Sequence, residues 1–391
     1  MKYASISDRL AGLGAAKWEV HYAGQQQARA GVPVIMLSIG EPDLPPPARV
    51  IERAIQSLQS GRTRYANGQG ELGARLAIAA HLADRSGMPV TPEQVLCTAG
   101  TQNGLYTALL TLVEHGDEVL VPDPYYATYE GLVASSGATF VPVQTAPEAA
   151  FHLTPAALEA AITPRSRVLL LNSPSNPTGA VLSLAEVDAI GAVCEKHDLW
   201  IVSDEVYADL TFSGRFCSPF DRPQLRARTL AVSSISKSHL LPGFRTGWVA
   251  ASADVVQRLL SVAEAMLFGS QPFLADALAE ALTGHHPEVD RFRDSLRGRA
   301  EAVVEAFAGC AHTQVRMPEG GMFLMVDVRA TGLDGEQFAW RLLEEEHVVV
   351  MPGESFGLGA AAGHVRVALT VDQAVLRDAC GRIRRLIERL A

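Results

Sequence analysis

Between about residue 48 and residue 280, segments with helical periodicity alternate with short apolar segments typical of buried strands. We predict helices over residues 48–59, 71–86, 101–114, 127–136 and 184–198. We predict strands over residues 95–98, 118–121, 139–143, 168–171, 200–203 and 230–232. Because alternating strands and helices form βαβ units, we expect an α/β fold with a mainly parallel sheet between two layers of helices.

The segments on both sides of this region follow a different pattern. After it, a long helix over 287–307 precedes short strands over 322–328, 348–351 and 365–369 and a final helix over 372–390. Before it, a strand-like segment over 34–39 ends at a run of prolines, which can continue neither a strand nor a helix. We therefore predict three parts: an N-terminal arm with part of the small domain at 1–45, a large domain at 46–280, and a small α+β domain at 281–391.

Polar residues follow most of the predicted strands of the large domain, at the edge where parallel sheets bind ligands. These segments are Gly100-Thr101-Gln102, Tyr125-Tyr126, Asn172 to Gly179, and Asp204-Glu205-Val206-Tyr207. Each segment alone has a structural explanation, because Asn-Pro-Thr-Gly forms turns and the others are typical of helix starts. Their repetition at one edge of the sheet indicates a binding site.

The loop after residues 230–232 contains a candidate nucleophile. Lys237 stands near Ser234 and Ser236, and Arg245 follows eight residues later. A lysine amine attacks carbonyl groups when its surroundings lower its pKa, and arginine with small hydroxyls binds phosphate. A Schiff-base lysine beside a phosphate site is what pyridoxal phosphate requires, and an exposed loop lysine is the structural alternative.

Composition and charge exclude several classes of protein. The 391-residue chain has a formal net charge of −10, which disfavours nucleic acid as its main partner. Its five cysteines lie far apart, so we expect no disulfide framework, no metal ion and a reducing, cytoplasmic location. It has no run of about 18 apolar residues and no signal-peptide pattern, so we expect no membrane as a partner.

Taken together, these motifs resemble those of class I/II aminotransferases, pyridoxal-phosphate-dependent enzymes of the aspartate aminotransferase fold type I. The resemblance runs from about Gly40 to Arg366. It includes Gly40-Glu41-Pro42-Asp43, Asn176-Pro177-Thr178-Gly179, Asp204-Glu205-x-Tyr207, and Ser-x-Ser-Lys237 with Arg245. It implies a seven-stranded sheet in the large domain. It also implies transfer of the amino group of an α-amino acid to a 2-oxo acid by a ping-pong mechanism.

For the cofactor, the resemblance implies that Lys237 binds the aldehyde group and moves the substrate proton, while Asp204 pairs with the ring nitrogen. Tyr207 and Asn176 would hydrogen bond the phenolic oxygen, and Tyr126 would stack on the ring. The residues implied at the phosphate are Arg245, Ser234, Ser236, Gly100, Thr101 and Gln102. Gly100 departs from members that have a serine at its position, so only its backbone can contribute.

For the substrate, the resemblance implies that Arg366 binds the α-carboxylate, with Asn176 and the backbone of Gly40 in the same site. Tyr65 matches a residue that reaches the phosphate of the neighbouring subunit, which implies a homodimer with shared active sites. We find no clear counterpart of the arginine that dicarboxylate-specific members use for the distal carboxylate. Its absence lowers the case for aspartate or glutamate as the donor.

Three segments show a narrower resemblance, to bacterial arginine–pyruvate transaminases: residues 15–22, 233–239 and 320–327. This makes arginine a candidate donor and pyruvate a candidate acceptor, with 2-oxoglutarate as an alternative acceptor. The same residues could instead serve a pyridoxal-phosphate-dependent lyase or decarboxylase. A non-catalytic ligand-sensing protein is a further alternative, although about 45 residues before the large domain are too few for a helix-turn-helix and its linker.

Overall fold

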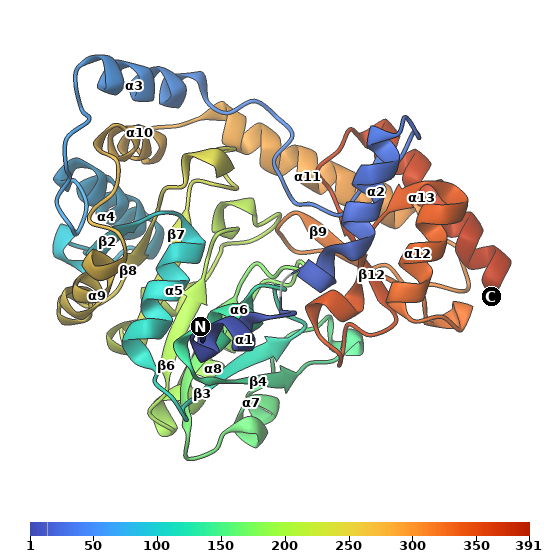
Figure 1. Ribbon diagram of the computed structural model, residues 1–391, viewed down its shortest axis with the longest axis horizontal. Coiled ribbons are helices and arrows are strands. Elements are labelled where there is room, and N and C mark those ends of the chain that lie inside the picture. Colours follow the sequence, from blue (N-terminus) through green and yellow to red (C-terminus); the bar gives the residue numbers. More distant parts are fainter. Residues whose placement is uncertain (14) are drawn as a thin grey trace.

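The computed structural model describes residues 1–13 and 15–391, which form two lobes (Figure 1). The large lobe is built on a seven-stranded sheet with the strand order β2-β8-β7-β6-β5-β3-β4. Its strands are β2 (Val95–Thr98), β3 (Glu118–Asp123), β4 (Thr139–Gln144), β5 (Ser166–Asn172), β6 (Trp200–Asp204), β7 (Thr229–Ser234) and β8 (Gly247–Ala250). Strand β8 runs antiparallel to β2 and β7, and the other neighbours pair in parallel. The predicted α/β fold with a mainly parallel seven-stranded sheet is confirmed.

Helices cover both faces of this sheet because its strands are apolar on both sides. Along β5, Val168 and Leu170 pack in one hydrophobic cluster, whereas Leu169 and Leu171 pack in another. The helices of the large lobe are α3 (Ala48–Gln59), α4 (Leu72–Ser86), α5 (Thr101–Leu112), α6 (Tyr129–Ser136), α7 (Pro155–Ala161), α8 (Leu184–Lys196), α9 (Ala253–Met266) and α10 (Pro272–Leu282). No helix in the described part of the chain is long and apolar enough to cross a lipid bilayer.

The small lobe is built on a three-stranded antiparallel sheet with the order β11-β12-β9. Its strands are β9 (Phe323–Asp327), β11 (Met351–Pro352) and β12 (His364–Ala368), and its long helices are α11 (Pro287–Ala306), α12 (Gly335–Glu346) and α13 (Gln373–Leu390). The predicted smaller α+β unit is therefore present. The boundaries at residues 45 and 280 stay a prediction.

The N-terminal segment touches both lobes. Helix α1 (Ser5–Leu10) lies against α6, where Nε of Arg9 donates to the carbonyl of Ala134 over 3.2 Å. Helix α2 (Glu19–Arg29) then packs beside α12, and β1 (Ile35–Met36) pairs in parallel with β10 (Val348–Val349). Figure 1 shows this blue segment among the orange and red elements of the small lobe. The chain thus begins on the large lobe and contributes to the small one.

Several predicted elements differ from the observed ones. The predicted strand over 34–39 is reduced to β1, because its partner β10 has two residues. The predicted strand over 348–351 divides, since β10 pairs with β1 while β11 pairs with β12. Strand β8 and the helices α7, α9, α10 and α12 were not delineated by periodicity. The other predicted elements are present, with ends shifted by at most two residues.

A buried ion pair fixes the N-terminal arm to the small lobe. Arg299 of α11 is 6% exposed, and its guanidinium donates to the two carboxylate oxygens of Asp43 over 2.9 and 2.8 Å. It also donates to the carbonyl of Leu369 over 2.9 Å. The Gly-Glu-Pro-Asp motif is therefore anchored by its last residue.

We predict that Arg299→Ala lowers the free energy of unfolding by about 2–3 kcal/mol, because it leaves a carboxylate and a carbonyl without their donor. The matched control is Arg297→Ala on the same helix, since Arg297 is exposed and its contact with Glu301 spans 3.8 Å. Urea titration of both variants measures the effect. Equal losses in the two variants would contradict it.

Candidate active site

A cavity of about 260 Å³ lies at the carboxyl ends of the parallel strands, and both lobes contribute to its wall. It brings together all of the predicted site residues except Gly100 and Tyr65. The predicted residues in its wall are Gly40, Thr101, Gln102, Tyr126, Asn176, Asp204, Tyr207, Ser234, Ser236, Lys237, Arg245 and Arg366. They come from segments more than 300 residues apart, so this assembly is a result of the tertiary structure.

Lys237 lies in the turn after β7, with its amine directed across the cavity. Its Nζ donates a hydrogen bond to the carbonyl of Gly40 over 2.6 Å. Burial lowers the pKa of Lys237 to about 8; the nearby Glu41 carboxylate opposes this shift, and Arg366 and Arg245 add to it. About a tenth of this amine is therefore neutral at pH 7, far more than for an ordinary lysine, and the neutral form is what a nucleophile or a general base requires.

Asp204 ends β6 and is 4% exposed. Its Oδ2 accepts a hydrogen bond from the hydroxyl of Tyr129 over 2.6 Å, and its Oδ1 accepts one from the backbone N–H of Val206 over 3.2 Å. Burial raises the pKa of Asp204 to about 6, against the opposing effect of the Tyr129 hydrogen bond. Such a carboxylate favours a cationic N–H partner in the cavity.

Tyr129 was missed by the sequence analysis, although it lines the cavity and is fully buried. It lies at the start of α6, and its ring meets the ring of Tyr126 edge to face at 5.6 Å between centroids. The one available signal was the spacing of three residues between two tyrosines at a helix start, which places both on one side of the first turn. Its partner Asp204 lies 75 residues away, so local patterns could not reveal the contact.

Tyr207 and Asn176 lie on the side of the cavity near the small lobe. Burial raises the pKa of Tyr207 above its ordinary range, and a hydrogen bond with Asn176 opposes the shift. The hydroxyl of Tyr207 is therefore protonated and can donate. Asn176 is itself held by Asn172, whose Oδ1 accepts from its backbone N–H over 2.7 Å.

Arg366 is a buried cation without an acidic partner in residues 1–13 and 15–391. Its Nη1 donates to Oδ1 of Asn176 over 2.8 Å, and its Nη2 donates to the carbonyl of Ser38. Its Cζ lies 4.0 Å from the ring centre of Phe323 and 4.4 Å from that of Phe356. Its Nε has no hydrogen-bond partner, and burial lowers its pKa to about 9. This guanidinium can therefore accept a bidentate carboxylate, with aromatic rings excluding water from it.

A second anion-binding feature is built at the N-terminus of α5. Thr101 is the first residue of this helix, and its hydroxyl donates to the hydroxyl of Ser234 over 2.9 Å. Arg245 lies beside this turn, where its Nη2 donates to the carbonyl of Ala99 over 3.4 Å. Gly100 has a φ of +81°, and a Cβ there would lie 2.5 Å from Nη2 of Arg245. Glycine is thus needed for the guanidinium to approach the unpaired N–H groups of the helix start.

Tyr65 does not reach this cavity. Its side chain is 89% exposed, and its ring packs edge to face against Phe268 at 6.1 Å. Trp18 and Phe323 do line the cavity, although the sequence analysis did not select them. Trp18 lies within one of the segments that resemble arginine–pyruvate transaminases. That position was the available signal for it.

Comparisons with known proteins show the family of the chain. The sequence profile of the family described as aminotransferase class I and II matches residues 32–383, so the chain belongs to this family. It is 42% identical to arginine–pyruvate transaminase AruH of Pseudomonas aeruginosa, over 98% of this chain and 97% of that protein. It is 32% identical to an aspartate aminotransferase of Geobacillus stearothermophilus, over 92% of each chain.

Solved structures show the same fold. The aspartate aminotransferase from Thermus thermophilus with maleate superposes with a TM-score of 0.92 at 31% identity, over 99% of this chain and 100% of that chain. The aspartate aminotransferase from Rhizobium meliloti gives a TM-score of 0.93 at 28% identity, over the whole of both chains. The chain is therefore an aminotransferase of fold type I, a family that generally depends on pyridoxal phosphate.

We predict that Asp204→Asn stabilises the cofactor-free protein above pH 6 and not near pH 4. In the native protein the pKa of Asp204 is about 6, against an ordinary value of 3.8. The folded state therefore binds more protons between these values, and its stability falls as pH rises through this window. Ionised Asp204 costs about 2–3 kcal/mol above it.

Urea unfolding at pH 4.5 and pH 7.5 measures this difference. The control is Asp198→Asn, because Asp198 is exposed and has a φ of +51° that asparagine tolerates. The control should change stability equally at both pH values. A loss of stability in Asp204→Asn at pH 7.5 would show that burial does not disfavour this carboxylate.

Proposed function

We propose that the cavity binds pyridoxal 5'-phosphate and uses it to move the amino group of an α-amino acid to a 2-oxo acid. One observation carries this proposal: Lys237, Arg245, Arg366 and Asp204 line one cavity. Arg245 and Arg366, which form no ion pair among the described residues, suit a phosphate and a carboxylate, and the buried acid suits a ring N–H. This is the charge distribution of the cofactor and an amino acid substrate held together.

The residues at the start of α5 fit the phosphate. Arg245, the hydroxyls of Ser234 and Ser236, and the first N–H groups of α5 at Thr101 and Gln102 converge on the cavity. Two backbone carbonyls hold the guanidinium of Arg245 beside this helix start: Nη1 donates to Pro242 over 2.9 Å and Nη2 donates to Ala99 over 3.4 Å. No carboxylate competes for Arg245 in the described ranges.

The opposite wall fits the pyridine ring. Asp204 would keep the ring nitrogen protonated, and Tyr129 would hold the carboxylate in the orientation for this contact. Tyr126 would lie against the face of the ring. The protonated hydroxyl of Tyr207 and the amide of Asn176 would donate to the phenolic oxygen.

When bound, pyridoxal phosphate supplies an aldehyde that takes up the amino group and a conjugated ring that accommodates the electron pair left at the substrate Cα. Lys237 would hold the aldehyde carbon between turnovers. Once the substrate amino group has displaced it, the Lys237 amine would take the proton from the substrate Cα. It would then deliver this proton to the cofactor carbon C4′. Its lowered pKa matches this exchange near neutral pH.

Arg366 would orient the substrate through its α-carboxylate. Asn176 and the carbonyl of Ser38 hold its guanidinium, and Phe323 and Phe356 cover its faces. A carboxylate held there would orient the substrate within the cavity that Lys237 also lines. Because an α-carboxylate is common to all donors, this contact would not select among side chains.

For the substrate pair, we propose arginine as the donor and pyruvate as the acceptor. The chain is 42% identical to arginine–pyruvate transaminase AruH over nearly its whole length, and 32% identical to the aspartate aminotransferase of Geobacillus stearothermophilus. The higher sequence identity supports arginine over aspartate as the donor. The missing counterpart of the distal-carboxylate arginine also disfavours aspartate.

We further propose a cytoplasmic homodimer with shared active sites. Tyr65 and Phe268 form an exposed aromatic pair, and the neighbouring Leu267 and Met266 are exposed as well. An apolar surface of this kind favours contact with another protein surface. In a dimer it would bring Tyr65 of one subunit to the phosphate of the other.

Two alternatives remain distinct in their products. A lyase or decarboxylase on the same residues would release ammonia, a cleaved fragment or an amine, whereas transamination leaves a 2-oxo acid and the aminated cofactor. A ligand-sensing protein would release none of these. A single-turnover assay with L-arginine separates the three.

We predict that Lys237→Ala lowers the turnover of arginine with pyruvate by about 10³-fold or more, because it removes the group that transfers the proton. Borohydride reduction followed by peptide mapping should label Lys237 in the parent protein. Capture of added pyridoxal phosphate should rise with pH through about 8, where the amine becomes neutral. The control is Lys196→Ala on α8, an exposed site. Normal turnover in Lys237→Ala would contradict the proposal.

We predict that Arg366→Ala raises KM by about 10- to 100-fold for every amino acid donor, because each loses the same charge-assisted hydrogen bonds. Steady-state kinetics with arginine, alanine and leucine measure this. Arg377→Ala, at an exposed site on α13, is the control. An effect confined to one donor would show that Arg366 contacts a side chain instead of the α-carboxylate.

A further inference from the structure

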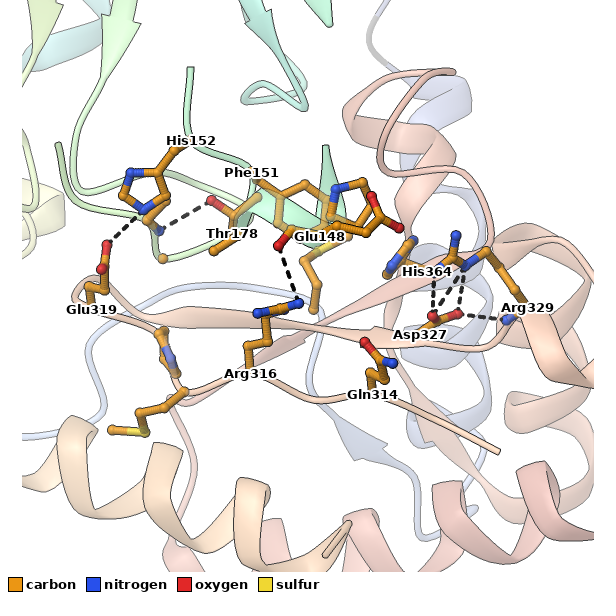
Figure 2. Close-up of a pocket in the computed structure, with 17 residues that line it drawn as sticks. Glu148, Phe151, His152, Thr178, Gln314, Arg316, Glu319, Asp327, Arg329 and His364 are labelled. Carbon is orange, nitrogen blue, oxygen red and sulfur yellow. Dashed lines mark hydrogen bonds and ion pairs between the residues drawn. The ribbon is translucent and has the colours of Figure 1, made fainter. Parts of the chain in front are cut away.

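A second cavity, of about 350 Å³, lies in the seam between the two lobes (Figure 2). It shares no lining residue with the cavity around Lys237. The large lobe contributes residues 147–152 and 178–180, and the small lobe contributes residues 314–319 with side chains from β9 and β12. None of these residues has a part in the proposed reaction.

Polar contacts cross the seam at one end of this cavity. Nε2 of His152 lies 3.1 Å from Oε2 of Glu319, and Nδ1 of His152 lies 2.7 Å from Oε1 of Glu186. Glu319 also accepts from the backbone N–H of Val181 over 2.7 Å. The hydrogen bond to Glu319 raises the pKa of His152 to about 9, so one imidazolium is shared by two carboxylates. Both ring nitrogens of His152 are therefore paired, and this end of the cavity carries a net negative charge.

The polar groups at the opposite end are paired as well. Arg329 pairs with both carboxylate oxygens of Asp327, over 3.0 and 2.7 Å. His364 is buried, burial lowers its pKa, and its Nδ1 lies 3.1 Å from the carbonyl of Ala362. Figure 2 shows these three side chains together, away from His152 and Glu319.

Two charged residues of the wall, Arg316 and Glu148, take no part in these ion pairs. Arg316 makes a single long hydrogen bond, from Nη2 to the backbone carbonyl of Glu148 over 3.4 Å. Neither Arg316 nor the carboxylate of Glu148 forms an ion pair within the described residues. Arg316 belongs to the small lobe and Glu148 to the large one. Both side chains line the cavity and are exposed at its mouth, and the Glu148 carboxylate also acts on the Arg329 guanidinium.

The remaining wall is apolar and partly strained. Phe151, Met317 and Met325 line it, and the ring of Phe151 meets that of His364 edge to face at 5.7 Å. Ala150 and Phe151 have φ values of +53° and +62°, which side chains other than glycine rarely adopt. The two residues end the short helical turn Pro147–Ala149, where the N–H of Ala150 donates to Pro147 and that of Phe151 donates to Ala146, and this turn places Phe151 in the wall.

We propose that this second cavity binds a small zwitterion of the α-amino acid class, with its carboxylate on Arg316, its ammonium group on Glu148 and its side chain against Phe151 and Met325. A simple anion would contact Arg316 alone, and a simple cation would contact Glu148 alone. A zwitterion pairs with both, and the cavity volume accommodates one amino acid.

Two segments connect this cavity to the cavity around Lys237. His364 and Arg366 lie two residues apart on β12 and so point to the same face of its sheet. Thr178 of the second cavity follows two residues after Asn176, which holds Arg366. A ligand in this cavity would touch both lobes. If it binds more tightly when the lobes are in contact, it shifts the population toward that arrangement. Binding itself is independent of the proposed function, whereas this coupling rests on it.

The experiment is equilibrium dialysis of the holoenzyme with radiolabelled cycloleucine, a zwitterion without a hydrogen on Cα. We expect two sites per subunit in the parent protein, one in Arg316→Ala, one in Arg366→Ala and none in the double variant. Glu148→Gln should also lose one site. Arg297→Ala, an exposed site on α11, is the control and should keep both. The remaining site in Arg316→Ala should be weaker by about fivefold or more, the size of a typical coupling between sites.

Each other outcome is informative. One site in the parent, or two in Arg316→Ala, overturns the inference. If Arg316→Ala binds at one site and Arg366→Ala still binds at two, the inference is supported. The same result contradicts the proposed role of Arg366. Displacement from the Arg316 site by cyclopentanecarboxylate or cyclopentylamine as strongly as by cycloleucine overturns the zwitterion as ligand. Unchanged affinity at the remaining site overturns the coupling.

Discussion

The active site depends on one buried guanidinium, that of Arg366. Asn176 of the large lobe, Ser38 of the N-terminal arm and Phe323 of the small lobe all contact it, so three distant parts of the chain meet at one cation. Taking an arginine out of water without an acidic partner is costly, and burial lowers its pKa to about 9. Under the proposed function, a substrate carboxylate that binds this guanidinium offsets the cost.

The same principle applies to the two other ionisable groups at the centre of the site. Burial raises the pKa of Asp204 to about 6 and lowers that of Lys237 to about 8, so low solvation brings both toward neutrality. The hydrogen bond from Tyr129 limits the shift of Asp204. Without a ligand, the charged forms of these groups are poorly solvated. Under the proposed function, a ligand that carries an anion, a cationic ring N–H and an amine would pair with them.

Much of the fold could be predicted because its large sheet is mainly parallel. Strands buried on both faces are continuous apolar runs, and the helices between them have their own periodicity. The antiparallel strand β8 escaped prediction, since Gly247–Ala250 is too short to show a pattern and its place between β2 and β7 depends on pairing across the sheet. The division of residues 348–351 between β10 and β11 has the same origin, because each half pairs with a different segment.

The sequence by itself determined the family, the α/β architecture and most residues of the candidate site, because Lys237, Asp204 and Asn176 occur in local motifs at strand ends. Tertiary structure alone decided that Tyr129 hydrogen bonds Asp204, that Arg366 meets no acidic partner among the described residues, and that Arg316 and Glu148 line one cavity from two lobes. The physical reason is the range of the interactions: periodicity and turn chemistry act over a few residues. Burial and charge pairing act between residues that meet only after the chain has folded.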